Sequence, residues 1–395
     1  MEQPQKKVLI VGGGFGGIKA AQELASHSEF NVSLISDQPE FRYYPALYKS
    51  ATGGSLLAAS LPLSHIFDDL AVNVIIDQVV NLDKTNKLAI GASGRSYHFD
   101  VLILALGSVT NYFEISGLKK YSFGIKSLEE VKELRDHLHG ELADPKQPDI
   151  NCVIVGGGPT GVELAGALPG YVQSVLKRHR LSKPKIKISL IEAQSRLLPS
   201  LPKGLSKKVQ KRLQRLGVVV KTSQEVQAET AEALMVDGHP IITHNVVWTA
   251  GVTSHPFLKK AGFSLSHNGK VIVNQFLQAG YNTYVIGDNA DTPYSGLAQT
   301  AIHDGAYVAG NLKRIATGRR PLPYRPRRPV YIIPIGPYWA AVCWGGLKFW
   351  GILGWLLRRF ADFMAYAGME TWWKASKRVL RARDQRTQCP LCEPE

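Results

Sequence analysis

Two glycine-rich segments have the residue types and the spacing to bind nucleotides. Both match Gly-x-Gly-x-x-Gly, the first with Gly12, Gly14 and Gly17 and the second with Gly156, Gly158 and Gly161. In this pattern the first glycine makes a tight turn, the second admits a pyrophosphate and the third lets a helix pack on a strand. The phosphates accept hydrogen bonds from free N–H groups at the helix start. Each segment therefore predicts a dinucleotide site.

The elements around both segments are those that such a site requires. Residues 8–11 and 152–155 are apolar, strand-like runs before the glycines, and residues 18–25 and 162–168 are helix-like runs after them. A single motif is weak evidence, because glycine turns also serve structural ends. Two complete strand–turn–helix units favour nucleotide binding strongly over that alternative.

A second strand follows each unit and should end beside a ribose. Residues 186–191 run into Glu192, whose carboxylate can accept a hydrogen bond from a free 2′-hydroxyl and would repel a 2′-phosphate, so we predict NADH rather than NADPH. In the first unit residues 31–35 are followed by Ser36 and Asp37, and either side chain could contact the ribose.

Two further strand ends are candidate parts of the first site. Residues 101–108 read as a buried strand that reaches Ala105 and Gly107, and residues 284–288 end in Gly287 and Asp288 before a helix-like run at 297–312. Asp288 suits a hydrogen bond to the ribityl or phosphate part of a flavin. A simple helix cap is the alternative interpretation.

Beyond these motifs the sequence resembles the type II NADH:quinone oxidoreductases, from about residue 7 to residue 377. The resemblance rests on residues 12–17, 41–48, 107–108, 111–113, 156–163, 192–193, 248–251, 287–288 and 298–301. It implies an α/β fold with two Rossmann-like dinucleotide-binding domains of the glutathione-reductase type. It also implies an enzyme that passes a hydride from NADH to FAD and both electrons to a membrane quinone without pumping protons.

The resemblance assigns residues to each ligand. Glu163 would place the nicotinamide, with a first-turn helix acid as the alternative, while Tyr44, Gln299 and His303 would line the quinone site. His303 departs from the family, which usually has glutamine there; it could protonate the quinone or be a satisfied structural residue. The remaining FAD contacts expected are Phe15, Val79, Ala105, Gly107, Asp288 and Gln299, and the remaining NADH contacts are Thr160, Ala250 and Gly251.

The cysteines exclude related chemistries. Enzymes with this double unit that reduce disulfides need a cysteine pair against the flavin, but residues 41–54 contain no cysteine. Sulfide oxidation relies on cysteines at the flavin in the same way. Cys389 and Cys392 have the spacing of half a zinc site without a second pair, so we predict a flexible tail and no metal site, with a redox or metal role as the alternative. Electrons should leave the flavin directly to a bound acceptor.

The C-terminal part carries most of the positive charge. Residues 313–386 hold 16 Lys or Arg and three acidic residues, and six of the seven tryptophans lie between 339 and 373. We expect strands up to Gly346, belonging to the flavin domain, and then a helix from Phe349 whose apolar stripe excludes Arg358, Arg359 and Asp362. A second basic helix should follow near Trp372 and Trp373. Cations with aromatic rings favour an in-plane membrane helix on anionic lipid over nucleic acid, with packing on the protein's own core or a homodimer as alternatives.

These observations give an expected organisation. The FAD domain comprises residues 1–118 and 275–334, the NADH domain residues 119–274, and strands, amphipathic helices and a basic tail residues 335–395. Few cysteines and no room for a signal peptide indicate a cytosolic start, so we expect peripheral attachment to the cytoplasmic side of the cell membrane. The alternatives are a soluble reductase of an acidic electron-carrier protein and a flavin-bearing redox sensor or interaction protein.

Overall fold

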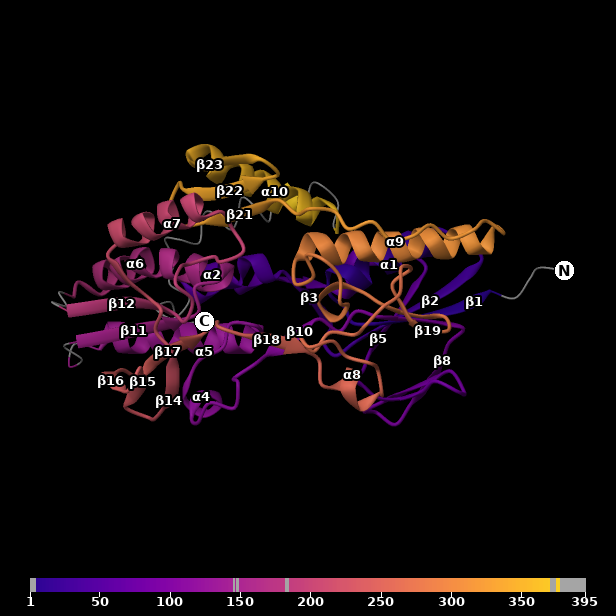
Figure 1. Cartoon of the computed structure of the whole chain (residues 1–395), viewed down its shortest axis with the longest axis horizontal. Helices are drawn as coiled ribbons and strands as arrows, with labels where there is room; N and C mark the ends of the chain where they lie inside the picture. Colours follow the sequence, from indigo (N-terminus) through magenta and orange to yellow (C-terminus); the bar gives the residue numbers. More distant parts are fainter. Residues whose placement is uncertain (1–4, 145, 147–148, 182–184, 370–373, 377–395) are drawn as a thin grey trace. The chain divides into compact units, whose positions relative to one another are not determined.

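The chain folds into two compact units. The computed structural model describes residues 5–144, 146, 149–181, 185–369 and 374–376 (Figure 1). Unit 1 comprises Met1–Phe41, Leu61–Val109 and Val252–Pro329, and unit 2 comprises Arg42–Ser60, Thr110–Gly251 and Val330–Glu395. The expected domains had boundaries at residues 118, 274 and 334, and the assignment of one cofactor to each of them stays a prediction.

Unit 1 is built on a six-stranded sheet with the order β19-β20-β9-β1-β2-β5. Its strands are β1 (Lys6–Val11), β2 (Phe30–Ser36), β5 (Val72–Ile76), β9 (Val101–Leu104), β19 (Gln278–Gly280) and β20 (Thr283–Val285). Strand β1 pairs in parallel with both β2 and β9, and β19 is antiparallel to β20. Because parallel strands are covered on both faces, the apolar runs of β1 and β9 are wholly buried at Val8–Val11 and Val101–Leu104.

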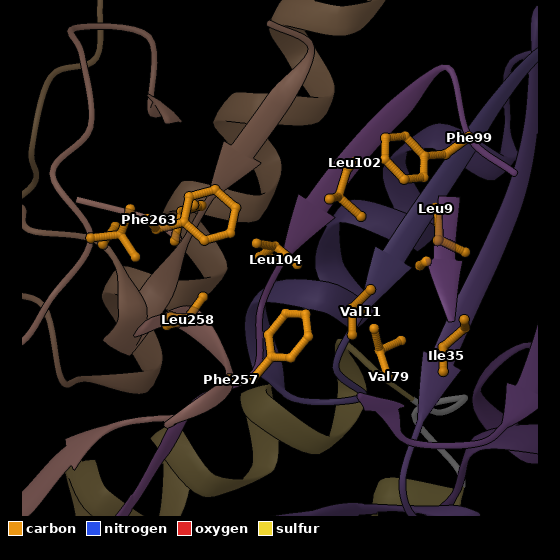
Figure 2. Packing of buried hydrophobic residues seen from close by; sticks show 14 residues of the cluster. Leu9, Val11, Ile35, Val79, Phe99, Leu102, Leu104, Phe257, Leu258 and Phe263 are labelled. Carbon is orange, nitrogen blue, oxygen red and sulfur yellow. The ribbon is translucent and has the colours of Figure 1, made fainter. Parts of the chain in front are cut away.

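One face of this sheet is covered by two helices that touch each other. These are α1 (Phe15–Ala25) and α9 (Ala298–Ala316), which lie side by side in Figure 1. A side chain at Gly305 would collide with the Gly16 carbonyl, so α9 needs glycine where it crosses α1. On the other face Leu9, Val11 and Leu104 pack in one cluster with Phe257 and Leu258 (Figure 2).

Smaller elements complete unit 1. They are α3 (Leu63–Ile66), the antiparallel sheet β6 (Val79–Asp83), β7 (Leu88–Gly91) and β8 (Ser96–His98), α8 (Phe257–Lys260) and the 3-10 turn η2 (Gly287–Asn289). Two short strand pairs stand where the chain passes between the units, namely β3 (Glu40–Arg42) with β4 (Ser60–Pro62) and β10 (Ser108–Thr110) with β18 (Val252–Ser254).

Unit 2 repeats the same plan with a four-stranded parallel sheet in the order β13-β12-β11-β17. Its strands are β11 (Asp149–Val155), β12 (Lys185–Glu192), β13 (Val218–Thr222) and β17 (Asn245–Trp248). Its helices are α2 (Tyr44–Ala51), η1 (Leu56–Ala58), α4 (Leu118–Tyr121), α5 (Leu128–Ala143), α6 (Pro159–His179) and α7 (Lys203–Arg215). An antiparallel sheet adds β14 (Val226–Glu229), β15 (Ala233–Val236) and β16 (His239–Ile242).

The C-terminal part of unit 2 is a three-stranded antiparallel sheet and a helix. They are β21 (Tyr331–Pro334), β22 (Ala340–Trp344), β23 (Leu347–Gly351) and α10 (Ile352–Ala367). The expected helix start at Phe349 is wrong, because Phe349 pairs with Val342 in β23 and the turn at Gly351, with φ +97°, precedes the helix. These strands lie in unit 2 rather than with the first glycine motif.

Parts of the expected tail lie outside the described residues. They include Trp372, Trp373, the basic residues from 377 onward, and Cys389 with Cys392. Among the helices that the structure does describe, none combines the length and the apolar character needed to cross a bilayer. The α/β class with two βαβ units is confirmed.

Candidate active site

The first glycine segment forms a cradle between β1 and α1. Gly12 has φ +117°, and a Cβ there would overlap the carbonyl oxygen of Ala105. A Cβ at Gly17 would overlap the Gly12 carbonyl, so strand and helix approach closely. Around Gly14 there is open space, and no side chain caps α1 at this position. The first N–H groups of α1 can therefore donate to a phosphate, and these residues fit the pyrophosphate of FAD.

The second strand brings both ribose candidates to the same edge. Ser36 ends β2 and is buried, and its Oγ accepts a hydrogen bond from the Gln38 backbone at 3.3 Å, whereas Asp37 is exposed. The other expected contacts have structural roles of their own. Phe15 is buried edge-on against Phe41, with 4.8 Å between ring centroids, and Val79 belongs to the core cluster.

The end of β20 is tied firmly to the end of β9. Ser108 Oγ donates to the Asp288 carboxylate at 2.9 Å, and Asn289 Nδ2 donates to the Gly107 carbonyl at 2.6 Å. The backbone N–H of Gly287 donates to the buried carboxylate of Asp304 at 3.0 Å. This network fixes Asp288 at the carboxyl edge of the sheet, where doubly wound folds bind their ligands.

Helix α9 carries Gln299 and His303 one turn apart. Gln299 is exposed, and His303 is partly buried with its Nε2 at 2.9 Å from the carbonyl oxygen of Arg325. The next residue, Asp304, accepts from Tyr324 Oη at 2.6 Å. Both interactions hold the proline-rich segment 321–329 against α9. Sequence reasoning did not consider this segment, although its prolines indicate an extended strand without internal hydrogen bonds.

The second glycine segment repeats the cradle between β11 and α6. Gly156 has φ +112°, and a Cβ there would lie 2.7 Å from Ala250 Cα. A Cβ at Gly161 would overlap the Gly156 carbonyl, while Gly158 faces open space at the start of α6. Thr160 and Ala250 are exposed beside this turn. The backbone of this turn fits the pyrophosphate of a second dinucleotide.

Glu192 is held at the end of β12 by the cradle itself. Its Oε2 accepts from the Gly157 N–H at 2.6 Å and its Oε1 from the Gln194 N–H at 2.7 Å. Each carboxylate oxygen has a second lone pair, so both can still accept from ribose hydroxyls. Gly251 is also closely packed. A Cβ at this position would collide with the ring of Phe113.

Glu163 lies in the second turn of α6 and is buried against a cation. Arg358 Nη1 donates to Glu163 Oε1 at 3.0 Å. The same guanidinium donates to Asp362 Oδ1 at 2.8 Å and to the backbone carbonyls of Ile332 and Pro45 at 2.9 and 2.8 Å. Asp362 also accepts from Lys49 Nζ at 3.1 Å and from Tyr43 Oη at 2.9 Å. We call Glu163, Arg358, Asp362, Lys49 and Tyr43 the buried charge network.

One carboxyl of the network has a pKa near neutral pH. Burial raises the pKa of Glu163 to about 7, although Arg358 opposes this shift. Asp362 is just as buried, but Arg358 and Lys49 together outweigh its desolvation and lower its pKa to about 2. Burial also lowers the pKa of Lys49, against the attraction of Asp362. Asp362 therefore stays ionised while Glu163 can exchange a proton at physiological pH.

Sequence reasoning found Glu163 and missed its partner. Arg358 and Asp362 were placed off the apolar stripe of their helix, which normally means facing water. In the structure they lie on the buried face of α10 with Gly354 and Tyr366. Tyr44 is exposed in unit 2, while Gln299 and His303 lie in unit 1, so a quinone site shared by the three remains a prediction.

Comparison with known proteins identifies the family of this chain. Residues 6–305 match the family described as pyridine nucleotide-disulphide oxidoreductase. A Staphylococcus aureus protein named type II NADH:quinone oxidoreductase is 30% identical over 342 residues, covering 80% of this chain and 84% of that protein. NDH2 from Plasmodium falciparum, solved in complex with NADH, superimposes with a TM-score of 0.87 at 16% identity, covering 98% of this chain and 100% of that one. The sulfide:quinone oxidoreductase of Aquifex aeolicus gives 0.78 at 18% identity, covering 98% and 93%.

These two structural likenesses show the fold, and the sequence matches show the family. The expected enzyme class, an FAD-dependent oxidoreductase that uses NAD(H), is confirmed. The resemblance drawn from the glycine turns and from residues 298–301 is confirmed with it. The chain belongs to the pyridine nucleotide-disulphide oxidoreductase family and, within it, to the type II NADH:quinone oxidoreductases.

Proposed function

We propose that this protein oxidises NADH and reduces a membrane quinone by two electrons, without pumping protons. FAD, when bound, supplies the chemistry that accepts a hydride and passes an electron pair to a second acceptor. The observation that carries the proposal is the buried carboxyl of Glu163. It lies two residues after the last glycine of the NADH cradle and titrates near pH 7.

The residues of each cradle do the binding. The N–H groups at the start of α6 hold the pyrophosphate of NADH, and Glu192 holds the ribose hydroxyls, which favours NADH because a 2′-phosphate would meet a carboxylate. The start of α1, Ser36 or Asp37, and Asp288 hold FAD in the same way. Residues 41–54 contain no cysteine pair that could accept electrons from the flavin. The electrons therefore go to a bound quinone.

Glu163 is the residue to which we assign proton transfer during quinone reduction. Its carboxyl can be neutral or charged at pH 7, and Arg358 stabilises the charged form through one hydrogen bond. Quinone reduction consumes two protons for its two electrons, so a group that releases and regains a proton near neutrality suits this site. Placing the nicotinamide is the second task that the resemblance gives to the same side chain.

His303 is better explained as a positioning residue than as a proton donor. Its Nε2 bonds the Arg325 carbonyl, which holds segment 321–329 on the same helix as Gln299. The amide of a glutamine could donate the same hydrogen bond, and glutamine is the residue that the family usually has there. We therefore expect His303→Gln to keep quinone activity.

Attachment to the cytoplasmic face of the cell membrane is part of the proposal. The outer side of α10 exposes Ile352, Leu353, Leu356, Phe360 and Met364, each more than half exposed, and we call these five residues the α10 face. Five large apolar side chains on one side of a helix are unusual in contact with water and suit insertion at the depth of the headgroups.

Steady-state oxidation of NADH by the FAD-loaded protein with a short-chain quinone tests the proposal. We expect turnover that falls about 10- to 100-fold in Glu163→Gln and is unchanged in the matched surface variant Glu133→Gln. The pH profile should also lose its inflection near pH 7 in Glu163→Gln only. If NADH reduces the flavin but quinone does not reoxidise it, the quinone half of the proposal is wrong and an acidic carrier protein becomes the acceptor to try.

A further inference from the structure

Helix α7 of unit 2 concentrates positive charge. It carries Lys203, Lys207, Lys208, Lys211, Arg212 and Arg215 and no acidic residue. All six side chains are exposed except Arg212, which is partly buried. The net charge of the chain before residue 313 is close to zero, so this basic cluster is not apparent from the composition.

The charge pattern of α7 works against the helix. Lys203 with Lys207, Lys207 with Lys211 and Lys211 with Arg215 are spaced four apart, where like charges repel. Lys203 also sits in the first turn, at the positive end of the helix dipole. Within the described part of the chain, no ion pair with an acidic side chain relieves these cations. A helix that keeps such a pattern is explained by an anionic partner outside the chain.

The cations of α7 border the sheet β21–β23, which exposes apolar side chains. Lys208 Nζ lies 4.8 Å from the ring centre of Trp350 in β23. Arg212 donates to the Ile335 and Pro337 carbonyls at 3.3 and 3.0 Å. Figure 1 shows α7 beside β21–β23 within unit 2. On this sheet Trp344 and Leu347 are more than half exposed, and Trp350, which points to the opposite face of β23 from Leu347, is 43% exposed beside α7.

We propose that α7 binds the headgroups of anionic phospholipids and thereby forms the electrostatic half of the membrane-docking surface. The inference rests on the peripheral attachment proposed above and adds a partner and a site in the nucleotide-binding part of the chain. Cations beside exposed tryptophans and apolar side chains match a bilayer surface, where rings lie at headgroup depth and cations meet lipid phosphates.

An acidic protein or a second copy of the chain fits this surface less well. An acidic protein would match the lysines, but it would leave the exposed apolar side chains Trp344, Leu347 and Trp350 on the neighbouring strands without a partner. A second copy would bring six more cations to the same patch and add repulsion. A membrane satisfies both halves, since it presents phosphates and hydrocarbon side by side.

The test compares two double variants of the full-length, FAD-loaded protein. Lys207→Gln/Lys211→Gln removes two exposed charges from α7, and Lys119→Gln/Lys120→Gln removes two from α4, which Figure 1 draws on the opposite side of unit 2. Co-sedimentation is measured with phosphatidylcholine vesicles that contain or lack phosphatidylglycerol. Each α7 lysine at the surface should contribute about fivefold to binding of anionic vesicles, so the α7 variant should bind about 25-fold more weakly.

The readouts separate this inference from the proposed function. Turnover with a water-soluble quinone should be the same in both variants and in wild type, and the α7 variant should be at least as heat-stable because all three repulsions between like charges spaced four apart are gone. If both variants bind anionic vesicles as wild type does, α7 is not a lipid site, whereas the proposed function stands. If the α7 variant instead loses self-association, measured by light scattering, the surface binds a second copy and the inference is wrong.

Discussion

Replacing Arg358 with methionine removes the cation that holds Glu163 and Asp362 in the interior. Methionine keeps most of the length of the side chain but donates no hydrogen bond. Asp362 keeps Lys49 and Tyr43 as partners, so it stays ionised. Among the described residues Arg358 is the one cation hydrogen-bonded to Glu163, so its loss must raise the pKa of Glu163 further above about 7.

The cost of this change depends on pH, and its sign follows from the raised pKa. In wild type the folded state holds the Glu163 proton more tightly than the unfolded chain does, so stability falls as pH rises through the acid range and levels off above about 7. In Arg358→Met the folded pKa is higher, so the fall continues above pH 7 at about 1.4 kcal/mol per pH unit. Between pH 7 and about 8.5 the variant should therefore lose more stability than wild type, by up to about 1.6 kcal/mol.

Urea unfolding followed by tryptophan fluorescence measures this loss. The five tryptophans among the described residues all belong to unit 2, so their emission reports the unit that contains the network. FAD is kept in excess at both pH values. Glu163→Gln with and without Arg358→Met completes a double-mutant cycle, and the titration of Lys49 cancels because both halves of the cycle contain it.

The reasoning fails if Arg358→Met costs the same at both pH values, since Glu163 would then not be the group that responds. It fails equally if the extra loss persists in the Glu163→Gln background. A loss that grows toward low pH would show that the sign is reversed, as for a carboxylate whose ionised form the fold stabilises.

Three further predictions concern single groups. Gly12→Ala should abolish FAD binding, measured by flavin absorbance of the purified protein, because the new Cβ collides with the Ala105 carbonyl. Glu192→Gln should raise KM for NADH about tenfold with little change in kcat, and narrow the preference over NADPH in the same kinetic assay, because the bond to the ribose loses its charge. Burial raises the pKa of Glu229 to about 8, which makes its charged form costly; Glu229→Gln should therefore stabilise the fold by about 2 kcal/mol at pH 9 and not at pH 4, by urea unfolding.

Both cradles could be predicted from the sequence because the backbone geometry alone requires glycine at these positions. Gly12 and Gly156 have positive φ and no space for a Cβ, and these requirements are visible as residue type and spacing. Glu192 was predictable for the same reason, since it is the last residue of a strand whose length the apolar run sets. Such features are local, so a single sequence contains them.

The buried charge network was not predictable in this way. Arg358 and Glu163 are far apart in the chain, and the charges on α10 were assigned to water by the rule that apolar residues face the core. The structure inverts this rule, since Leu353 is 66% exposed and Arg358 is 8% exposed. One local signal was present: Arg358 and Asp362 share a face with Gly354 and Tyr366, a small residue and an aromatic that suit close packing.

The inversion of α10 explains why so many polar contacts converge on it. Its large apolar residues face outward, so apolar burial alone cannot set its position against unit 2. Arg358 bonds Glu163 and two backbone carbonyls, and Tyr366 Oη bonds the Ala58 carbonyl, which fixes the helix in rotation and in register. Buried charges are costly to desolvate and seldom add stability, but they specify one arrangement where apolar packing would allow several. The helix that we assign to the membrane is thus held by the same guanidinium that opposes the effect of burial on Glu163, so a displacement of α10 at the bilayer would change the proton affinity of that carboxyl.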